Sequence, residues 1–336
     1  MMATFRRMAV LLLAILTLAG CSALGSDDSS SSNNNQGSGA TAGAPEKAKV
    51  KVAVLPTMDT VPLYLAMDAG YFKEVGLEVT PVMAASGADC VAKMVSGEVD
   101  FAFSSWTPFF VAKSKGVADV KLVADATTSA NGYSVVSTMP NSAIQGAKDL
   151  AGKRVAITAK LTMSHLLVLS ALKDAGVDAG TVQFAEMAFP QMVPALQGGQ
   201  VDAAFLVEPF IQGAVKAANV RQVLDTNSGS STDMPLTGYA ATGPFVSGNK
   251  KTVEAFQRAL KKATDDIAKG DRTKVDPLLE KIAKVDSATA KKTTLANFVS
   301  SLDPTKIQRV VDLMVEFKAL DKRIEVADMV VKPPTA

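Results

Sequence analysis

Apolar and polar positions along this chain follow two periods, and segments of the two kinds alternate. The runs VKVAVLPT, LEVTPVMA and VDFAFS are alternating or β-branched and predict strands. Between them, VPLYLAMDAGYFKEVG has helical spacing and predicts a helix that ends at Gly76, while GADCVAKMVSG predicts a short helix stopped by Gly97. The first half of the body therefore predicts the order β-α-β-α-β.

The same order recurs about 100 residues later. RVAIT, TVQFAEMA and VDAAFLV predict strands, and MSHLLVLSALKDAG and PQMVPALQGG predict helices. Both copies contain G-x-V-D-x-A-F, and we expect its aspartates, Asp100 and Asp202, to serve structurally in helix-to-strand turns. Strands that alternate with helices predict parallel sheets covered by helices. The duplication therefore predicts two α/β lobes with a cleft between them.

The N-terminal segment has a different character from the body. Residues 1–21 combine Arg6 and Arg7 with a short apolar stretch, which is typical of a signal peptide. Leu18 to Cys21 resemble a bacterial lipobox with Cys21 as the lipidated residue, although an ordinary cleavage site is the alternative. Residues 22–48 are rich in Ser, Asn and Gly and predict a disordered tether.

Composition excludes several classes of function. Without Arg6 and Arg7 the 35 basic residues become 33, against 33 acidic ones, which argues against binding of nucleic acid. One histidine and one cysteine besides Cys21 argue against a Cys/His metal site, and we expect no metal and no cofactor. Neither a Ser-His-Asp spacing nor a phosphate loop is present, so we expect no enzyme activity.

Five segments carry a resemblance to a known family. They are PLYLAMDAGYFKEVGLEV, MVSGEVDFAF, DLAGKRVAI, SHLLVLSALKDAGV and ALQGGQVDAAFLVEPF. In this order they resemble the solute-binding proteins of ABC importers in the nitrate, sulfonate, taurine and bicarbonate group, which includes thiamine-pyrimidine binders. The resemblance implies a periplasmic-binding-protein-like fold of type II, with two α/β lobes joined by two hinge strands. We expect residues 49–127 plus 236–336 to form lobe 1 and residues 128–235 to form lobe 2.

The resemblance also implies a function and partners. The protein would capture a small organic anion by lobe closure and deliver it to an ABC permease driven by a separate ATPase. We expect a monomer outside the cytoplasm, held to the membrane by its lipid anchor only. The alternatives are a ligand sensor without transport, a structural lipoprotein, and an enzyme of the pyrimidine-synthase type, whose cysteine-rich pattern is missing here.

Candidate ligand-binding residues of the first lobe follow its predicted strands, because open α/β sheets bind ligands at the carboxyl ends of strands. Helix starts there offer free N–H groups to an anion. Trp106 is either a flat wall of the cleft, which we favour, or a core residue, and Thr60 is either a ligand contact or a plain N-cap. The candidates are Met58, Asp59, Thr60, Ser86, Gly87, Ser104, Ser105 and Trp106.

The second lobe offers a matching set. We expect Thr162 or Ser164 to cap a helix whose start faces the anion. His165 is either a cleft residue or a buried histidine, and Glu208 is either a ligand acceptor or a hinge residue. The candidates are Thr162, Ser164, His165, Met187 and Glu208, with Phe189 and Gln191 expected nearby.

Two features of the loops bear on the ligand. Strong-anion binders of this group often use an arginine in the cleft, and no candidate loop contains one. The loops contain methionines instead, which line adaptable apolar pockets. We therefore expect an anion with an apolar body, with a neutral heterocycle or an aromatic carboxylate as the alternative.

The segments that join the lobes, and the C-terminal third, complete the predicted architecture. We expect TTSANGY to cross between the lobes and LTGYAAT, around Tyr239, to return. Two C-terminal helices are expected to pack on the first lobe: one has Val253, Phe256 and Leu260 on one face, and the other begins at the N-cap pair Asp303-Pro304.

Overall fold

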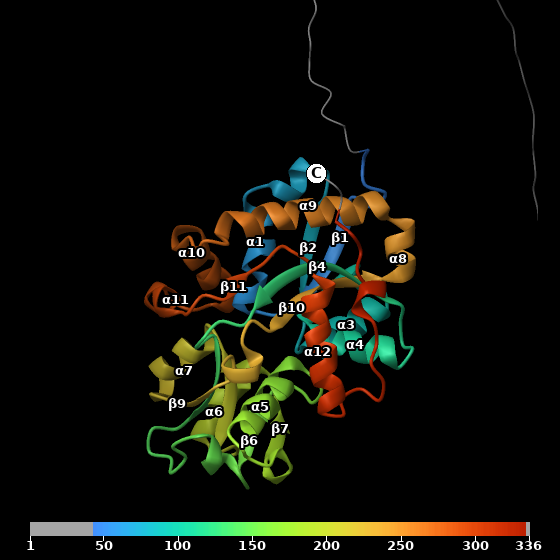
Figure 1. The fold of residues 1–336 in the computed structure, drawn as a ribbon. Helices are drawn as coiled ribbons and strands as arrows, with labels where there is room; N and C mark the ends of the chain where they lie inside the picture. The colour runs from blue at the N-terminus through green and yellow to red at the C-terminus, as the bar shows by residue number, and fades with distance from the viewer. Residues whose placement is uncertain (1–42, 334–336) are drawn as a thin grey trace, which may run out of the picture. The chain divides into compact units, whose positions relative to one another are not determined.

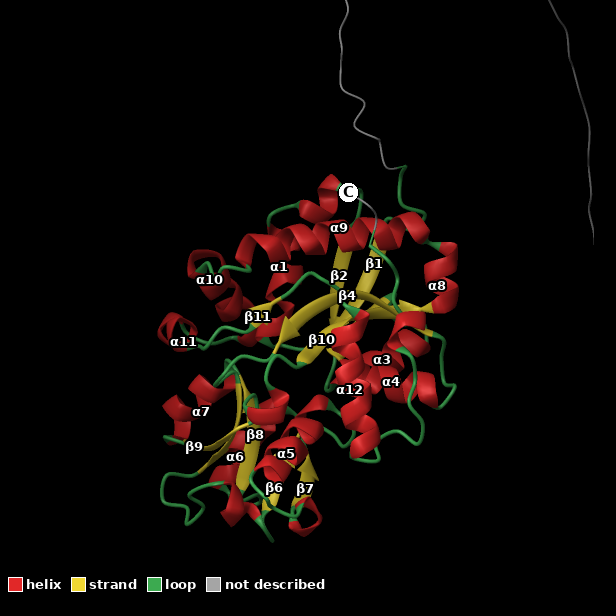
Figure 2. Ribbon diagram, in the orientation of Figure 1, coloured by secondary structure: helices red, strands yellow, loops and turns green. Residues whose placement is uncertain are grey.

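Residues 43–333 are described by a computed structural model, and their strands form two separate sheets (Figures 1 and 2). The predicted signal peptide, Cys21 and most of the predicted tether lie outside the described residues. Within the described part, no helix combines the length and apolar character that crossing a bilayer requires.

The first sheet has six strands, and the three from the first sequence repeat run parallel. The neighbouring strand from later in the chain runs antiparallel to them. In spatial order the strands are β11 (Asn297–Phe298), β4 (Val120–Thr128), β10 (Pro235–Thr242), β3 (Phe101–Ser105), β1 (Lys49–Val54) and β2 (Glu78–Met83).

The second sheet has five strands with the same arrangement, as the sequence repeat predicts. Its three parallel strands come from the second repeat, and β5 runs antiparallel beside them. In spatial order the strands are β7 (Gln183–Glu186), β6 (Arg154–Ile157), β8 (Ala203–Val207), β5 (Ser134–Thr138) and β9 (Arg221–Asp225).

The repeated aspartates have one structural role, carried out twice. Asp100 precedes β3, and its Oδ2 accepts a hydrogen bond of 3.0 Å from the backbone N–H of Lys51 in β1. Asp202 precedes β8 in the same way, and its Oδ2 accepts one of 2.8 Å from Arg154 N–H in β6. Each carboxylate thus satisfies an N–H at the start of the central parallel strand, which confirms the predicted structural role.

Asp202→Ala is expected to lower the free energy of unfolding by about 1–2 kcal/mol. The substitution removes a charge-assisted hydrogen bond to the backbone and an ion pair of 2.8 Å with the Arg154 guanidinium, which is partly exposed. Denaturant unfolding measures this loss. Glu98→Ala is the control, because the exposed Glu98 carboxylate pairs only with Lys93, and an equal effect of both changes would contradict the assigned role.

Helices surround both sheets. The predicted helix ending at Gly76 is wrong in one respect: Gly70 adopts φ 79°, in the left-handed region, so it divides the segment into two helices. The helices of the first sheet's side are α1 (Val61–Asp68), α2 (Tyr71–Glu74), α3 (Gly87–Val95), α4 (Trp106–Ser114), α8 (Gly243–Gly248), α9 (Lys250–Ile267), α10 (Arg272–Ala283), α11 (Ser287–Lys292) and α12 (Pro304–Glu316). Those of the second are α5 (Met163–Asp174), α6 (Phe189–Gln197) and α7 (Phe210–Ala218).

Two crossings connect the sheets. Residues 129–133 lead from β4 to β5, as predicted, and residues 226–234 lead back from β9 to β10. The crossings are hydrogen-bonded to each other, since Ser129 N–H donates to Met234 O over 2.9 Å. The expectation that LTGYAAT makes the return is wrong: this segment lies after the crossing, inside β10, where Tyr239 is opposite Phe103. The lobe boundaries given above, 127/128 and 235/236, remain our proposal.

The C-terminal third contacts both lobes. The predicted apolar face of α9 is buried, and Phe256 stacks on Phe101 with ring centroids 4.2 Å apart. Helices α9 and α12 pack on the first lobe as expected, since α9 contacts α1 and α12 contacts α4. Helix α11, in contrast, contacts α7 of the second lobe and pairs through Asp286 with Lys216. Glu316 of α12 likewise pairs with Lys173 of α5. These two ion pairs link the C-terminal third to helices of the second lobe.

The body begins slightly before the predicted end of the tether. Glu46 accepts hydrogen bonds from the N–H groups of Lys251 and Thr252 at the start of α9, over 3.2 and 2.9 Å. Lys47 pairs with Asp100 at 2.7 Å. Residues 46–48, assigned to the tether from their composition, therefore contact the first lobe.

Candidate functional site

A cavity of about 70 Å³ lies where residues of the two lobes meet. A water molecule needs about 10–15 Å³ of such volume, so the cavity has room for roughly five to seven water-sized groups. Residues from both sheets, from the crossings and from helix starts line it. They are Leu55, Thr57, Asp59, Gly87, Phe103, Ser105, Tyr133, Ser134, Thr158, Thr162, Met163, Ser164, Leu167, Phe189, Phe205, Val207, Leu236 and Thr237.

Three helices with a glycine or hydroxyl residue at their start begin at this cavity, two from the first lobe and one from the second. Helix α6 also begins there, with the apolar Phe189. Gly87 is the first residue of α3, Ser105 is the N-cap of α4, and Thr162 is the N-cap of α5. Neither Ser105 nor Thr162 caps its helix through its side chain. The partial positive charges of these three helix starts therefore lie at the same small space, which favours an anionic group.

A cluster of hydroxyl groups lies beside the start of α5. Thr158 Oγ1 is 2.7 Å from Ser164 Oγ and 3.1 Å from Thr162 Oγ1, and Thr162 Oγ1 is 2.8 Å from Ser164 Oγ. Ser164 Oγ also accepts a hydrogen bond from Thr158 N–H. Hydroxyl groups both donate and accept, so this cluster can turn its donors toward a bound anion.

The two lobes touch each other at the cavity. Met163 N–H in the first turn of α5 donates to Ser105 Oγ over 3.4 Å, which links the starts of α5 and α4. In a second contact, Tyr133 from the first crossing donates its hydroxyl to Asp59 of the first lobe. Both contacts join residues that line the cavity, so a ligand there would contact both lobes at once.

Asp59 is the charged side chain among the lining residues. It is 4% exposed, and its carboxylate accepts hydrogen bonds from Tyr133 Oη, Thr127 Oγ1 and Thr237 Oγ1 over 2.6, 2.6 and 3.2 Å. Burial raises the pKa of Tyr133 well above its usual value and the Asp59 carboxylate raises it further, so this phenol keeps its proton and donates it. The site thus contains a buried carboxylate held by three hydroxyl donors.

The remaining wall is apolar and partly aromatic. Leu55, Phe103, Met163, Leu167, Phe189, Phe205, Val207 and Leu236 line it. Phe189, expected near the cleft from the sequence, stacks on Phe210 with ring centroids 5.1 Å apart. The combination of hydroxyls, helix starts and an apolar wall suits a small organic molecule with a polar end.

Five of the predicted ligand contacts line the cavity: Asp59, Gly87, Ser105, Thr162 and Ser164. Several others lie just behind its wall. Met58 and Thr60 are fully buried, and the Thr60 hydroxyl donates to Thr57 O over 2.8 Å. Ser86 caps α3 by accepting from Asp89 N–H. For these residues a ligand contact stays a prediction.

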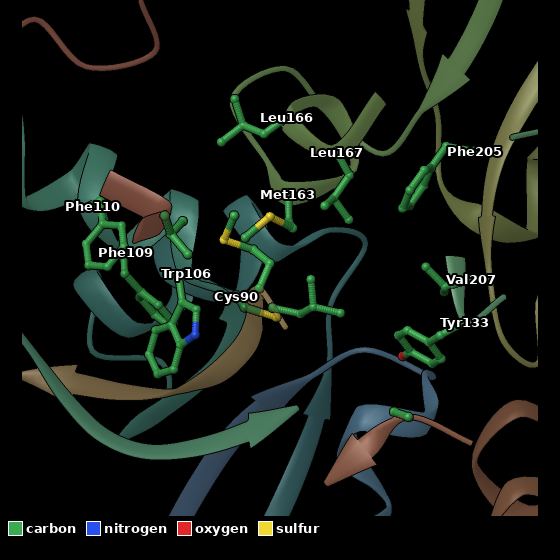
Figure 3. Close-up of a cluster of buried hydrophobic side chains, with 14 of the residues drawn as sticks. Cys90, Trp106, Phe109, Phe110, Tyr133, Met163, Leu166, Leu167, Phe205 and Val207 are labelled. Atoms are coloured by element: carbon green, nitrogen blue, oxygen red, sulfur yellow. The ribbon is translucent and has the colours of Figure 1, made fainter. Parts of the chain in front are cut away.

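Trp106 belongs to the core of the first lobe. It is 0% exposed and packs with Phe109, Phe110 and Cys90, whereas Tyr133 and Phe205 lie apart from it (Figure 3). Its Nε1 and the nearby Ser104 Oγ have no hydrogen-bond partner among the described residues. The structure therefore places Trp106 and Ser104 behind the lining residues, and their contact with a ligand is untested.

The other predicted residues of the second lobe also lie outside the lining. His165 packs edge-on against Phe184, and burial together with Lys160 lowers the pKa of His165 to about 4, so it is neutral at pH 7. Met187 is half-buried. Glu208 is fully buried, and its Oε1 accepts from Gln212 Nε2 and from Thr294 N–H over 2.9 and 3.1 Å.

Sequence reasoning missed lining residues that belong to the crossings. Tyr133 ends the first crossing, and Thr237 follows the second. Both segments were predicted to connect the lobes. Segments that connect two lobes run beside the space between the lobes, so their residues can line a cavity there. That topological signal was available in the sequence. Thr57 and Thr158 were missed for a different reason: they lie between the strand ends and the helix starts, and only the residues at the helix starts were predicted as contacts.

Residues 57–272 match the model of a family described as NMT1/THI5 like. Among curated relatives, the taurine-binding periplasmic protein of Escherichia coli (strain K12) is 27% identical over 194 residues, which is 57% of this chain and 58% of that protein. A putative aliphatic sulfonates-binding protein of Bacillus subtilis (strain 168) is 25% identical over 333 residues, which is 96% of this chain and 93% of that protein. The match to the Escherichia coli relative spans less than two thirds of its length.

Solved structures share the fold. The alkanesulfonate-binding protein SsuA of Xanthomonas axonopodis pv. citri, bound to MOPS, has a TM-score of 0.73 at 19% identity and covers 86% of this chain and 99% of its own. The periplasmic nitrate-binding protein NrtA of Synechocystis PCC 6803 has a TM-score of 0.74 at 16% identity, covering 86% of this chain and 87% of its own. With more than half of its length matched by one family model, this chain, whose fold is that of a periplasmic binding protein with two α/β lobes and a cavity between them, belongs to the NMT1/THI5-like family.

Proposed function

We propose that the protein is the substrate-binding component of an ABC importer and captures a small organic anion of the sulfonate or taurine type. One observation carries this proposal: three helix starts from two lobes meet at one small cavity whose lining contains neither lysine nor arginine. Helix starts and hydroxyls bind an anion without a formal positive charge. The names of the relatives, which bind taurine and aliphatic sulfonates, support the same class of ligand.

The ligand contacts we propose are Asp59, Gly87, Ser105, Thr162 and Ser164. Binding between the lobes would close them, and the closed form would be delivered to a permease driven by a separate ATPase. We further propose that the lipobox-like sequence ending at Cys21 anchors the protein by a lipid outside the cytoplasm, and that the protein is a monomer. In this proposal the protein binds its ligand and catalyses nothing.

A neutral heterocycle or an aromatic carboxylate is the second candidate ligand. The observation that favours it is the aromatic wall, to which Phe103, Phe189 and Phe205 contribute. Aromatic rings pack against flat ligands at 4.5–7 Å between centroids. A bare inorganic ion such as nitrate leaves this wall uncovered, so tight binding of nitrate or bicarbonate would contradict the proposed organic ligand.

A ligand screen tests the proposal, and we expect a sulfonate at about 100 times its dissociation constant to add about 2.7 kcal/mol to the free energy of unfolding. Gly87→Val is expected to remove this gain, because a Cβ at Gly87 would lie 2.4 Å from Ser104 Oγ and its methyl groups would cover the start of α3. Thermal unfolding with taurine, alkanesulfonates, aromatic carboxylates and pyrimidines provides the measurement.

The matched control is Gly146→Val. A Cβ at Gly146 meets no atom within 4 Å, and Gly146 does not line the cavity. Stabilisation by the same ligand should persist in this variant. A flat response of the wild-type protein to every sulfonate would remove the support for the proposed ligand class, and equal stabilisation of wild type and Gly87→Val would place the ligand elsewhere.

A further inference from the structure

The hydroxyl donors around Asp59 leave its charge unbalanced. Of the described residues, none forms an ion pair with the Asp59 carboxylate, although only 4% of this residue is exposed. Hydroxyl donors satisfy hydrogen bonds but bring no positive charge. A buried carboxylate without a cationic partner is costly, and proteins normally pair such a charge.

The carboxylate also has capacity for a further donor. Its two oxygens offer about four lone-pair positions, and Thr127, Thr237 and Tyr133 occupy three of them. Because Asp59 lines the cavity, the remaining position is within reach of a molecule bound there. Thr57, which also lines the cavity and is 3% exposed, has a hydroxyl without a partner among the described residues.

The helix starts at the cavity and the Asp59 carboxylate together select between ligands of different charge. The starts of α3, α4 and α5 attract a negative group, whereas Asp59 repels one. A simple alkyl anion satisfies the helix starts but leaves Asp59 buried and unpaired. A molecule with an acidic end and an ammonium end satisfies both.

We propose that Asp59 binds a positively charged amine of the ligand, so the natural ligand is a short zwitterion such as an aminoalkylsulfonate. This inference rests on the proposed function for its acidic end only. A charge-assisted hydrogen bond from an ammonium group to a buried carboxylate is stronger than one from a hydroxyl group. The protein therefore selects the amine against an isosteric alcohol or alkane.

Four two-carbon probes separate the two ends of the ligand by calorimetric titration. Taurine carries an amine and a sulfonate, isethionate and ethanesulfonate carry the sulfonate without the amine, and ethylamine carries the amine alone. We expect the wild-type protein to bind taurine at least about tenfold more tightly than isethionate or ethanesulfonate. Equal affinities for these sulfonates would overturn the inference but leave the proposed function intact.

Asp59→Asn tests the residue itself. The amide oxygen still accepts from Thr127 and Thr237, and the amide nitrogen can donate to Tyr133 Oη, so the local hydrogen bonds persist while the charge is lost. We expect the tenfold preference for taurine to fall below about twofold in this variant, and a preserved preference would overturn the assignment. If the variant does not fold, the comparison of probes on the wild-type protein decides.

Asp125→Asn is the matched control. Asp125 is another buried aspartate of the first lobe, 6% exposed, and it does not line the cavity. Its substitution should leave the preference for taurine unchanged. Binding of ethylamine that is lost in Asp59→Asn, without binding of any sulfonate, would support the amine site and refute the proposed sulfonate ligand. Failure of all four probes to bind would refute both.

Discussion

Gly238→Ala is expected to lower the free energy of unfolding by about 3 kcal/mol, because the added methyl group has no space. A Cβ at Gly238 would lie 2.0 Å from Cη2 and 2.3 Å from Cζ2 of Trp106, and 2.7 Å from the backbone oxygen of Ala124. Trp106 is fully buried and cannot swing into solvent. Overpacking of this kind costs about 1–3 kcal/mol and occasionally more.

Denaturant unfolding provides the measurement, and two further variants identify the cause. Gly213→Ala is the control, since a Cβ there meets no atom within 4 Å inside α7, and we expect it to stabilise the protein by up to about 1 kcal/mol. Trp106→Phe removes the clashing ring atoms, so the double variant with Gly238→Ala should cost less than the sum of the single changes. Additive costs would show that the indole is not the obstacle.

Asp125→Asn is expected to stabilise the protein by about 4 kcal/mol at pH 8 and by almost nothing near pH 4. Burial raises the pKa of Asp125 to about 7, and the nearby Asp303 carboxylate adds to this effect, while the Ala126 N–H and Lys306 oppose it. The rise from the ordinary value of 3.8 is about three units, and each unit corresponds to about 1.36 kcal/mol.

The sign follows from proton binding. Between pH 4 and pH 7 the folded protein holds a proton on Asp125 that the unfolded chain has released, so the free energy of unfolding falls as the pH rises through this window. The isosteric amide cannot ionise and lacks this fall. Denaturant unfolding of both proteins from pH 4 to pH 8 measures the difference, and a difference independent of pH would contradict the buried, raised pKa. Asp321→Asn, at an exposed position, should stay within about 0.5 kcal/mol of wild type throughout.

Prediction from sequence succeeded where the information is local. The strand and helix order of both repeats was confirmed, because alternation and helical spacing report directly which face of an element is buried. The turn role of Asp100 and Asp202 was confirmed for a related reason: a carboxylate just before a strand is in reach of the neighbouring strand's N–H. The helix break at Gly70 was missed, because the φ angle of a glycine inside an apolar run cannot be predicted from the run itself.

The candidate site could be predicted only in part. Gly87, Ser105 and Thr162 were found because helix starts after parallel strands can be located in the sequence. Trp106 was favoured as a cleft residue from its serine neighbours, yet the structure buries it, because the orientation of the first residue in α4 depends on the sheet beneath it. Tyr133 and Thr237 were missed because their proximity to Asp59 joins positions 74 and 178 residues away from it.

Local pattern alone was thus sufficient for the two α/β repeats, for their helix starts and for the absence of an arginine in the candidate loops. It could not show that three of these helix starts share one cavity, that a buried carboxylate lines the same cavity, or that α11 contacts the second lobe. Those features depend on contacts between residues distant in the chain, which form only when the crossings bring the two sheets together. A side chain's type and spacing are encoded locally, whereas its burial and its charge partners come from the packing of the whole molecule.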